Sequence, residues 1–170
     1  MPDNPMRKIG ISKVVVNIGS GNEEKQADAA RRLIELVTGR KPADEISKNR
    51  RPAFKITRGQ RIGAYVTLRG KTANETLKRL LDAADNKVKL SGLTTNSLSF
   101  GIREYIDIRG VKYDPSIGML GMNVNVSFSR KGRRVSARKR LSSKIPARHA
   151  KISADEIKEY MAREFKAEFN

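Results

Sequence analysis

The stretch that decides the fold is residues 9–39, IGISKVVVNIGSGNEEKQADAARRLIELVTG. In its first part, the apolar residues Val14, Val16 and Ile18 recur at every second position, which predicts a strand. Its second part carries apolar residues at helical spacing and ends at Gly39, a residue that suits the C-terminal cap of a helix. The stretch therefore predicts a strand, a tight turn and a helix in direct succession.

The same alternation of strand and helix continues outward along the chain. Residues 62–68 alternate again, and Thr72 with Glu75 has the spacing of a capping box at the start of a second helix. Ser153 with Glu156 has the same spacing and predicts a third helix. The other expected strands are residues 44–47, a strand-like run within 98–108, and residues 122–128.

This order predicts an α+β fold. The expected architecture is an antiparallel sheet with helices packed on one face, in the split βαβ topology of ferredoxin-like and RRM-like domains. A basic extension and a C-terminal helix are added to it. We expect one domain over residues 1–170, with a basic loop at 48–61 and the extension at 130–151.

The excess positive charge sits in two stretches that contain no acidic residue. Eight Lys or Arg lie between Glu45 and Glu75, and ten lie between Asp114 and Asp155. Together they equal the formal net charge of +18, so the rest of the chain is balanced. A solvated charged surface explains a single lysine run, but charge segregated in this way indicates a polyanionic partner, above all a nucleic acid.

The sequence contains no evident catalytic centre. It has no Cys and a single His, His149, which lies among cations, so no metal site or cofactor is expected. The turn Gly19-Ser20-Gly21 follows a strand as a phosphate loop would, but it lacks the Walker Lys and precedes Glu23 and Glu24. It is better interpreted as a plain tight turn.

The basic loop combines cations with one aromatic residue. Phe54 could stack on a base of folded or single-stranded RNA, or it could be tucked into the core beneath the loop. The cations that we expect to contact RNA, and to which the resemblance described below assigns tRNA or rRNA, are Lys48, Arg50, Arg51, Lys55, Arg58 and Arg61.

The basic extension shows no apolar periodicity, and its charges should hold it open in the absence of RNA. We expect it to contact RNA phosphates, which the resemblance described below makes those of rRNA, and thus RNA shape more than sequence. The residues expected to do so are Arg130, Lys131, Arg133, Arg134, Arg138, Lys139, Arg140, Lys144, Arg148 and His149.

Several longer segments together resemble a known family. They are KVVVNIGSG (13–21), TGRKP (38–42), FKITRGQRIG (54–63), VTLRG (66–70) and, later, FGIREYIDIRGVKYDP (100–115) and KIPARH (144–149). In this order they are similar to the L-five family of large-subunit ribosomal proteins, in its archaeal and eukaryotic branch.

The resemblance implies a non-enzymatic, cytoplasmic protein of the large ribosomal subunit. Members bind 5S rRNA, attach it to the central protuberance and contact large-subunit rRNA. They also contact peptidyl-site tRNA, a small-subunit protein of the S-thirteen family at an intersubunit bridge, and other central-protuberance proteins. The family's 5S rRNA-binding positions match Asn17, Phe54 and Thr67, whereas Arg40 stands where the bacterial motif has Gln.

Three other classes of protein remain as alternatives. An RNA-modifying enzyme could dock its substrate on the basic stretches, but it would need a catalytic centre. A free-standing nucleic-acid chaperone or DNA-compacting protein would show little preference among RNAs and DNA. A membrane-surface protein is disfavoured because neither basic stretch is amphipathic at helical spacing.

Overall fold

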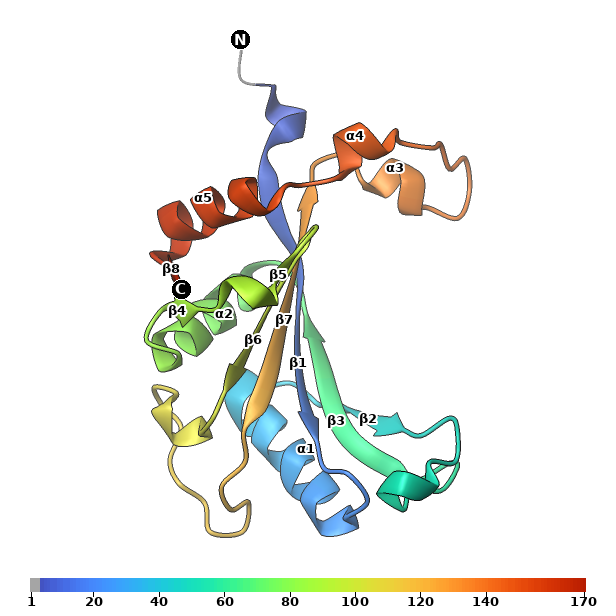
Figure 1. Cartoon of the computed structure of the whole chain (residues 1–170), viewed down its shortest axis with the longest axis vertical. Helices are drawn as coiled ribbons and strands as arrows, with labels where there is room; N and C mark the ends of the chain where they lie inside the picture. The colour runs from blue at the N-terminus through green and yellow to red at the C-terminus, as the bar shows by residue number, and fades with distance from the viewer. Residues whose placement is uncertain (1–3) are drawn as a thin grey trace.

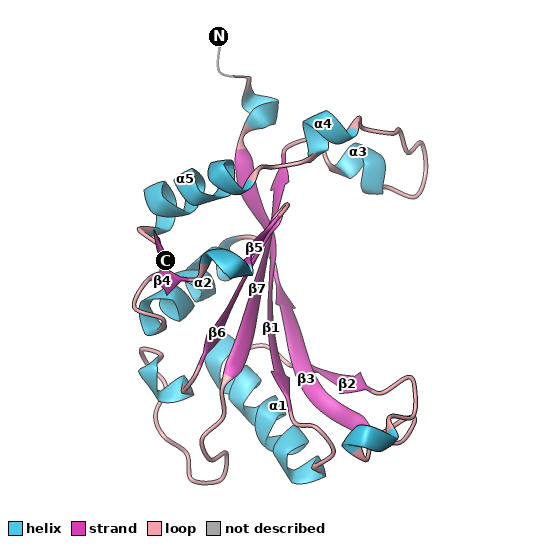
Figure 2. Ribbon diagram, viewed as in Figure 1, coloured by secondary structure: helices cyan, strands magenta, loops and turns pink. Residues whose placement is uncertain are grey.

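The computed structural model describes residues 4–170, except for the side chains of residues 147 and 148. Its centre is an antiparallel sheet with the strand order β2-β3-β1-β7-β6-β5 (Figures 1 and 2). The strands are β1 (Ile9–Gly19), β2 (Ala43–Ile46), β3 (Arg61–Leu68), β5 (Leu93–Thr94), β6 (Ser97–Ile102) and β7 (Met122–Arg130). Because β3 pairs antiparallel with both β1 and β2, those two strands are parallel, and the predicted split βαβ arrangement is confirmed.

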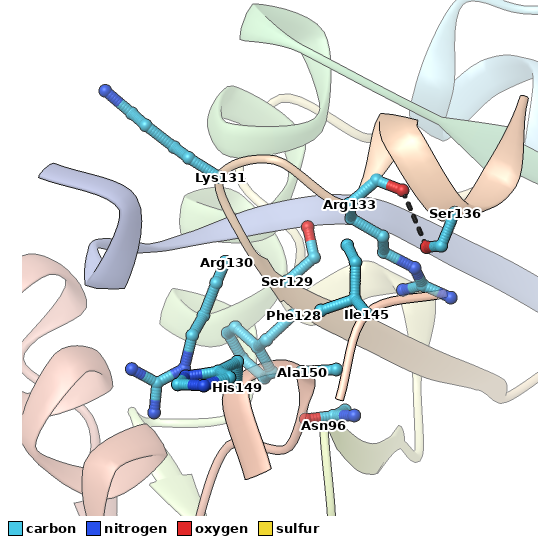
Figure 3. Close-up of a pocket in the computed structure, with 10 residues that line it drawn as sticks. All are labelled: Asn96, Phe128, Ser129, Arg130, Lys131, Arg133, Ser136, Ile145, His149 and Ala150. Atoms are coloured by element: carbon cyan, nitrogen blue, oxygen red, sulfur yellow. Dashed lines mark hydrogen bonds between the residues drawn. The ribbon is translucent and has the colours of Figure 1, made fainter. Parts of the chain in front are cut away.

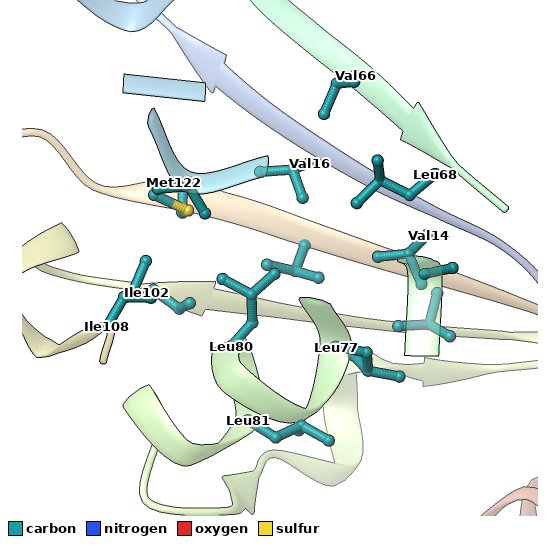
Figure 4. Packing of buried hydrophobic residues seen from close by; sticks show 14 of the residues in the cluster. Val14, Val16, Val66, Leu68, Leu77, Leu80, Leu81, Ile102, Ile108 and Met122 are labelled. Carbon is teal, nitrogen blue, oxygen red and sulfur yellow. The ribbon is translucent and has the colours of Figure 1, made fainter. Parts of the chain in front are cut away.

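The longer helices cover one face of this sheet. They are α1 (Glu24–Thr38), α2 (Lys71–Ala83) and α5 (Ala154–Phe165). Their apolar residues, among them Leu33, Leu80 and Met161, are fully buried in one cluster with Val16 and Val124 of the sheet. Figure 4 shows part of this cluster, with Leu77 and Leu80 of α2 facing the sheet. The side chains that alternate with this cluster along the strands therefore lie on a second, open face.

Short elements complete the chain. A separate two-stranded parallel sheet joins β4 (Lys87–Val88) to β8 (Glu168–Phe169), which holds the end of the chain beside α2. The remaining elements are η1 (Pro5–Arg7), η2 (Pro52–Phe54), η3 (Leu90–Gly92), η4 (Tyr105–Asp107), α3 (Arg134–Ala137) and α4 (Ala147–Ala150). Within residues 4–170, no helix has both the length and the apolar character needed to cross a membrane.

Two local expectations were wrong. The capping box of Thr72 and Glu75 does not form, because Gly70 adopts a positive φ of 67° and lets α2 begin directly at Lys71. The strand expected within residues 98–108 ends at Ile102, and the fully buried Tyr105 follows in a 3-10 turn. By contrast, the box of Ser153 and Glu156 is present and caps α5.

Candidate nucleic-acid interface

The open face of the sheet carries an ordered set of neutral polar side chains. Asn17 of β1 lies opposite Tyr65 of β3 and Asn123 of β7, and Asn123 in turn lies opposite Gly101 of β6. In the next row, Val15 lies between Thr67 and Asn125, and Asn125 faces Ser99. These two rows define what we call the open face.

Asn17 and Thr67 lie on this face, because each alternates with buried residues along its strand. Each is partly exposed and stands between buried neighbours, such as Val16 beside Asn17 and Val66 beside Thr67. The register places them on adjacent strands, one row apart, because Val15 is the residue that pairs with Thr67. The structure thus brings these two candidate residues onto one surface.

Next to Asn17, the open face is hollowed. A shallow depression of about 350 Å³ is lined by residues that include Asn17, Ser99, Gly101, Asn123 and Asn125. Among the residues that the structure describes, no donor reaches the buried Oδ1 atom of Asn17. A buried acceptor without a partner costs free energy, so this atom marks a strained point of the open face.

Sequence reasoning missed Asn123, Asn125 and Ser99 as members of this site. The signal was present, because Asn123 and Asn125 alternate with Val124 and Val126, which are fully buried. Only the pairing of β7 with β1, however, brings them beside Asn17, and that pairing joins segments more than 100 residues apart.

Arg40 and Phe54 lie outside the two rows of the open face. Arg40 is exposed and just precedes β2, whose Ala43 pairs with Tyr65. The Phe54 side chain is 71% exposed on the η2 turn, which rules out the alternative that it packs into the core. An exposed aromatic ring at this position can stack on a base.

The basic loop is held in a defined shape by backbone hydrogen bonds. Arg51 N donates to Ile56 O at 2.9 Å, and Ile56 N donates back to Arg51 O at 3.1 Å. At the base of the loop, Ser47 N donates to Gln60 O at 2.9 Å. The cations Lys48, Arg50, Arg51, Lys55 and Arg58 project from it and are all exposed.

Arg61 differs from the other cations assigned to this loop. It belongs to β3, is only partly exposed and forms an ion pair with Asp28 of α1, with Nη1 and Oδ1 3.2 Å apart. Its charge is therefore partly balanced within the protein, unlike the charges of the loop itself.

Arg130 likewise has a partner within the fold. Its Nη2 atom donates to Oε1 and Oε2 of Glu156 at 2.8 and 2.9 Å, and its side chain is 16% exposed. Burial raises the pKa of the Glu156 carboxyl, but hydrogen bonds from the Ser153 backbone and from Arg130 outweigh it and lower the pKa overall. Arg130 thus ties the end of β7 to the start of α5.

Asn96, in the turn between β5 and β6, holds both ends of the basic extension. Its backbone O accepts from Phe128 N at 2.8 Å, and its Oδ1 accepts from Ile152 N at 2.7 Å. Between these anchors the chain forms a protruding lobe that carries α3 and α4 (Figure 1). We call residues 131–151 the lobe.

The cations of the lobe are displayed to solvent. Those whose side chains the structure describes are exposed and form no ion pair with a described acidic residue: Lys131, Arg133, Arg134, Arg138, Lys139, Arg140 and Lys144. His149 is exposed in α4, while the Arg148 side chain lies outside the described part of the chain. The lobe therefore offers a dense set of cations that phosphates can neutralise.

The groups on these surfaces are suited to binding. In the part of the chain that the structure describes, no three His, Asp or Glu side chains gather as a metal site. The open face presents amides and hydroxyls, and the lobe presents cations. This chemistry serves recognition of a polyanion by shape and hydrogen bonding.

Comparison with known proteins identifies relatives over nearly the whole chain. The model of "Ribosomal protein L5" matches residues 4–57, and the model of "ribosomal L5P family C-terminus" matches residues 61–160. Proteins called "Large ribosomal subunit protein uL5" are similar throughout. The one from Sulfurisphaera tokodaii is 40% identical over 163 residues, which is 95% of this chain and 92% of its own. The one from Nanoarchaeum equitans is 43% identical over 156 residues, which is 91% and 92% of the two chains.

Proposed function

The chain belongs to the ribosomal protein L5 family, structural and non-enzymatic constituents of the large ribosomal subunit, and we propose that it binds 5S rRNA there. In this proposal it attaches 5S rRNA to the central protuberance of the cytoplasmic ribosome. The observation that carries the proposal is the open face, where Asn17 and Thr67 share one surface beside a polar hollow.

The open face suits RNA for physical reasons. Its amides and hydroxyls can donate to and accept from base edges and 2′-hydroxyls, and they leave phosphate neutralisation to groups outside the two rows. Arg40 and Phe54 are exposed outside the two rows, so the cation can meet phosphate and the ring can stack on a base. Since Arg replaces the amide of the bacterial motif, we expect Arg40 to contact phosphate rather than to read a base.

The basic surfaces fit the other expected partners. We propose that the lobe binds large-subunit rRNA, because its exposed cations have no acidic partner among the described residues. The basic loop, with Phe54 at its tip, is proposed to reach peptidyl-site tRNA. Contacts with an S-thirteen family protein and with other central-protuberance proteins rest on the family resemblance alone.

The first test is binding of the purified protein to 5S rRNA over a salt series, with tRNA and duplex DNA as competitors. When binding occurs through phosphates alone, the logarithm of the binding constant falls linearly with the logarithm of the salt concentration. The slope is roughly −0.7 to −0.9 per phosphate contact. We expect 5S rRNA to stay bound at moderate salt while both competitors are lost. A parallel decline of all three ligands would refute the 5S assignment and favour a free-standing chaperone.

A double variant then tests the open face. We expect Asn17→Ala with Thr67→Val to lower 5S rRNA affinity by about tenfold or more, since two polar contacts cost roughly 1.4 kcal/mol or more. The matched control is Asn74→Ala with Thr72→Val, which makes the same two changes on α2, on the other side of the sheet. Equal affinities of the two well-folded variants would rule out the open face as the 5S site.

A further inference from the structure

A pocket lies where β7 leaves the sheet and the lobe folds back over its end. It encloses about 170 Å³ and is lined from three parts of the chain: Asn96, the end of β7, and both arms of the lobe (Figure 3). It is distinct from the hollow of the open face, with which it shares no lining residue.

The pocket is lined by both apolar and polar groups. Ile145 and Ala150 contribute apolar surface, and Phe128 lies at the sheet end with its ring buried in an edge-on contact with Tyr160 at 5.9 Å between centroids. Arg133 supplies donors, and so does Asn96, whose Oδ1 already accepts from Ile152 N, which leaves its amide NH₂ as the donor. Apolar groups together with a few placed donors suit a flat, partly polar ring.

The size of the pocket narrows the choice of ligand. A protein cavity of about 150 Å³ accommodates one benzene molecule, so 170 Å³ suits a single aromatic ring but not a peptide helix or an RNA duplex. A larger cavity of about 600 Å³ adjoins it, shares Arg130, Lys131, Ile145 and His149 with it, and adds Arg7 and Glu156, the carboxylate that pairs with Arg130. A ring in the first cavity would therefore have its attached phosphates near Arg7 and Lys131 in the second.

We propose that this pocket receives one unstacked nucleobase of large-subunit rRNA, with the flanking phosphates in the adjoining cavity. The inference rests on the rRNA-binding function proposed above and adds a base contact to a lobe whose other contacts are to phosphate. Single-stranded and bulged RNA is recognised in this way, because an unstacked base needs a surface to replace its neighbours.

The first experiment separates base binding from phosphate binding. Amide chemical shifts of the ¹⁵N-labelled full-length protein are followed during titration with uridine 5′-monophosphate, ribose 5-phosphate or inorganic phosphate. We expect the uridine nucleotide to shift Ser129, Ile145 and Ala150 and to bind about tenfold more tightly than ribose 5-phosphate. Equal affinities of the three ligands would reduce the pocket to a phosphate site and overturn the proposal.

A pair of variants tests the location. Ser136 lines the pocket and is exposed, so Ser136→Leu fills the space without a change of charge. Ser142→Leu makes the same change at an exposed lobe position that does not line it. We expect only Ser136→Leu to weaken uridine nucleotide binding, by about fivefold or more; equal binding by both variants would contradict the proposal.

Crosslinking then separates rRNA from a free nucleotide as the ligand. The full-length protein is irradiated with large-subunit rRNA that contains 4-thiouridine, and the crosslinked peptides are identified by mass spectrometry. Crosslinks at Ile145 or Ala150 that disappear in Ser136→Leu and persist in Ser142→Leu are the expected result. If the protein binds this rRNA but crosslinks only elsewhere, the pocket inference fails alone; if it does not bind the rRNA, the rRNA-binding role of the lobe fails as well.

Discussion

The open face and the lobe are both suited to RNA, yet they are built in opposite ways. On the open face, side chains such as Asn17 and Asn123 are placed by cross-strand pairing over a packed core. In the lobe, the cations project from short helical turns and irregular chain, and the described ones are exposed. The first surface holds neutral groups in fixed positions, while the second concentrates charge.

The difference shows how one small protein can combine positioning with affinity. Neutral hydrogen-bonding groups discriminate between RNA structures only when their positions are fixed, as the sheet register fixes them. Phosphate contacts tolerate imprecise placement, because the Coulomb attraction is long-ranged and non-directional. The two surfaces should therefore respond differently to salt, to charge reversal and to added bulk.

The largest effect is expected from charge reversal in the lobe. Replacement of Arg138, Lys139 and Arg140 by Glu should lower affinity for large-subunit rRNA by about 100-fold, because three phosphate contacts become repulsive. The affinity for isolated 5S rRNA should change by less than about threefold, since screening limits the reach of these charges. Filter binding with each RNA at one fixed salt concentration measures both values.

The control for this variant reverses three charges elsewhere. Lys25, Lys158 and Lys166 lie on or next to helices outside the lobe, and their replacement by Glu changes the net charge equally. If the lobe variant loses both RNAs to the same degree, the two surfaces do not have separate roles.

The next largest effect is expected on the open face, where the hollow can be filled. A Cβ atom at Gly101 would lie 3.5 Å from Asn123 Oδ1, which is ordinary contact, so the fold should tolerate Gly101→Leu. We expect 5S rRNA affinity to fall about tenfold, or roughly 1.4 kcal/mol, with little change in salt dependence. Ala154→Leu adds bulk at an exposed position of α5 and should leave this affinity unchanged.

A smaller loss of 5S rRNA affinity is expected when Phe54 is replaced. Phe54→Leu removes a stacking surface and should lower 5S rRNA affinity by about fivefold, whereas Phe54→Tyr should preserve it. Because the ring is 71% exposed, the free energy of unfolding should change by less than about 0.5 kcal/mol. A large loss of stability in Phe54→Leu, measured by urea unfolding, would show that the ring has a structural role.

The smallest effect is expected on stability, at the Arg130–Glu156 pair. This pair ties the end of β7, where the lobe begins, to the start of α5. Glu156→Gln keeps a capping residue but removes the charge, and should lower the free energy of unfolding by about 0.5–1 kcal/mol at pH 7. Because the folded-state pKa of Glu156 lies below its ordinary value of 4.5, the stabilisation is full above that pH and is lost as pH falls through the lowered pKa.

Urea unfolding at several pH values checks this expectation. The difference in free energy of unfolding between the wild type and Glu156→Gln should shrink below pH 4.5. Glu159→Gln, at an exposed position of the same helix, should show no such difference. A difference that stays constant down to pH 2.5 would mean that the charge of Glu156 is not what stabilises the fold.

Sequence patterns predicted the elements that have strong periodicity. Residues 9–39 form the expected strand and helix, and Gly39 caps α1 with a positive φ of 64°. The final helix and its capping box were also predicted correctly. In each case the signal is local, since apolar spacing and cap residues act within one element.

The errors arose where contacts between distant parts of the chain determine the local structure. The run 98–108 resembled a strand, but burial of Tyr105 and its hydrogen bond from Asp114 N at 3.0 Å turn the chain after Ile102. For the site, alternation placed Asn17 and Thr67 on one face. The hollow, and the pocket beneath the lobe, depend on pairings and on chain returns that no local pattern encodes.

The two hydrogen bonds of Asn96 have a consequence for the evolution of this protein. Because its backbone and side chain hold both ends of the lobe, residues 131–151 form a closed loop on a finished domain. Closing a loop of twice the length costs only roughly 0.6 kcal/mol more entropy. Insertions and deletions in the lobe are therefore nearly neutral for folding, and the lobe can follow the drift of its RNA partner while the sheet remains unchanged.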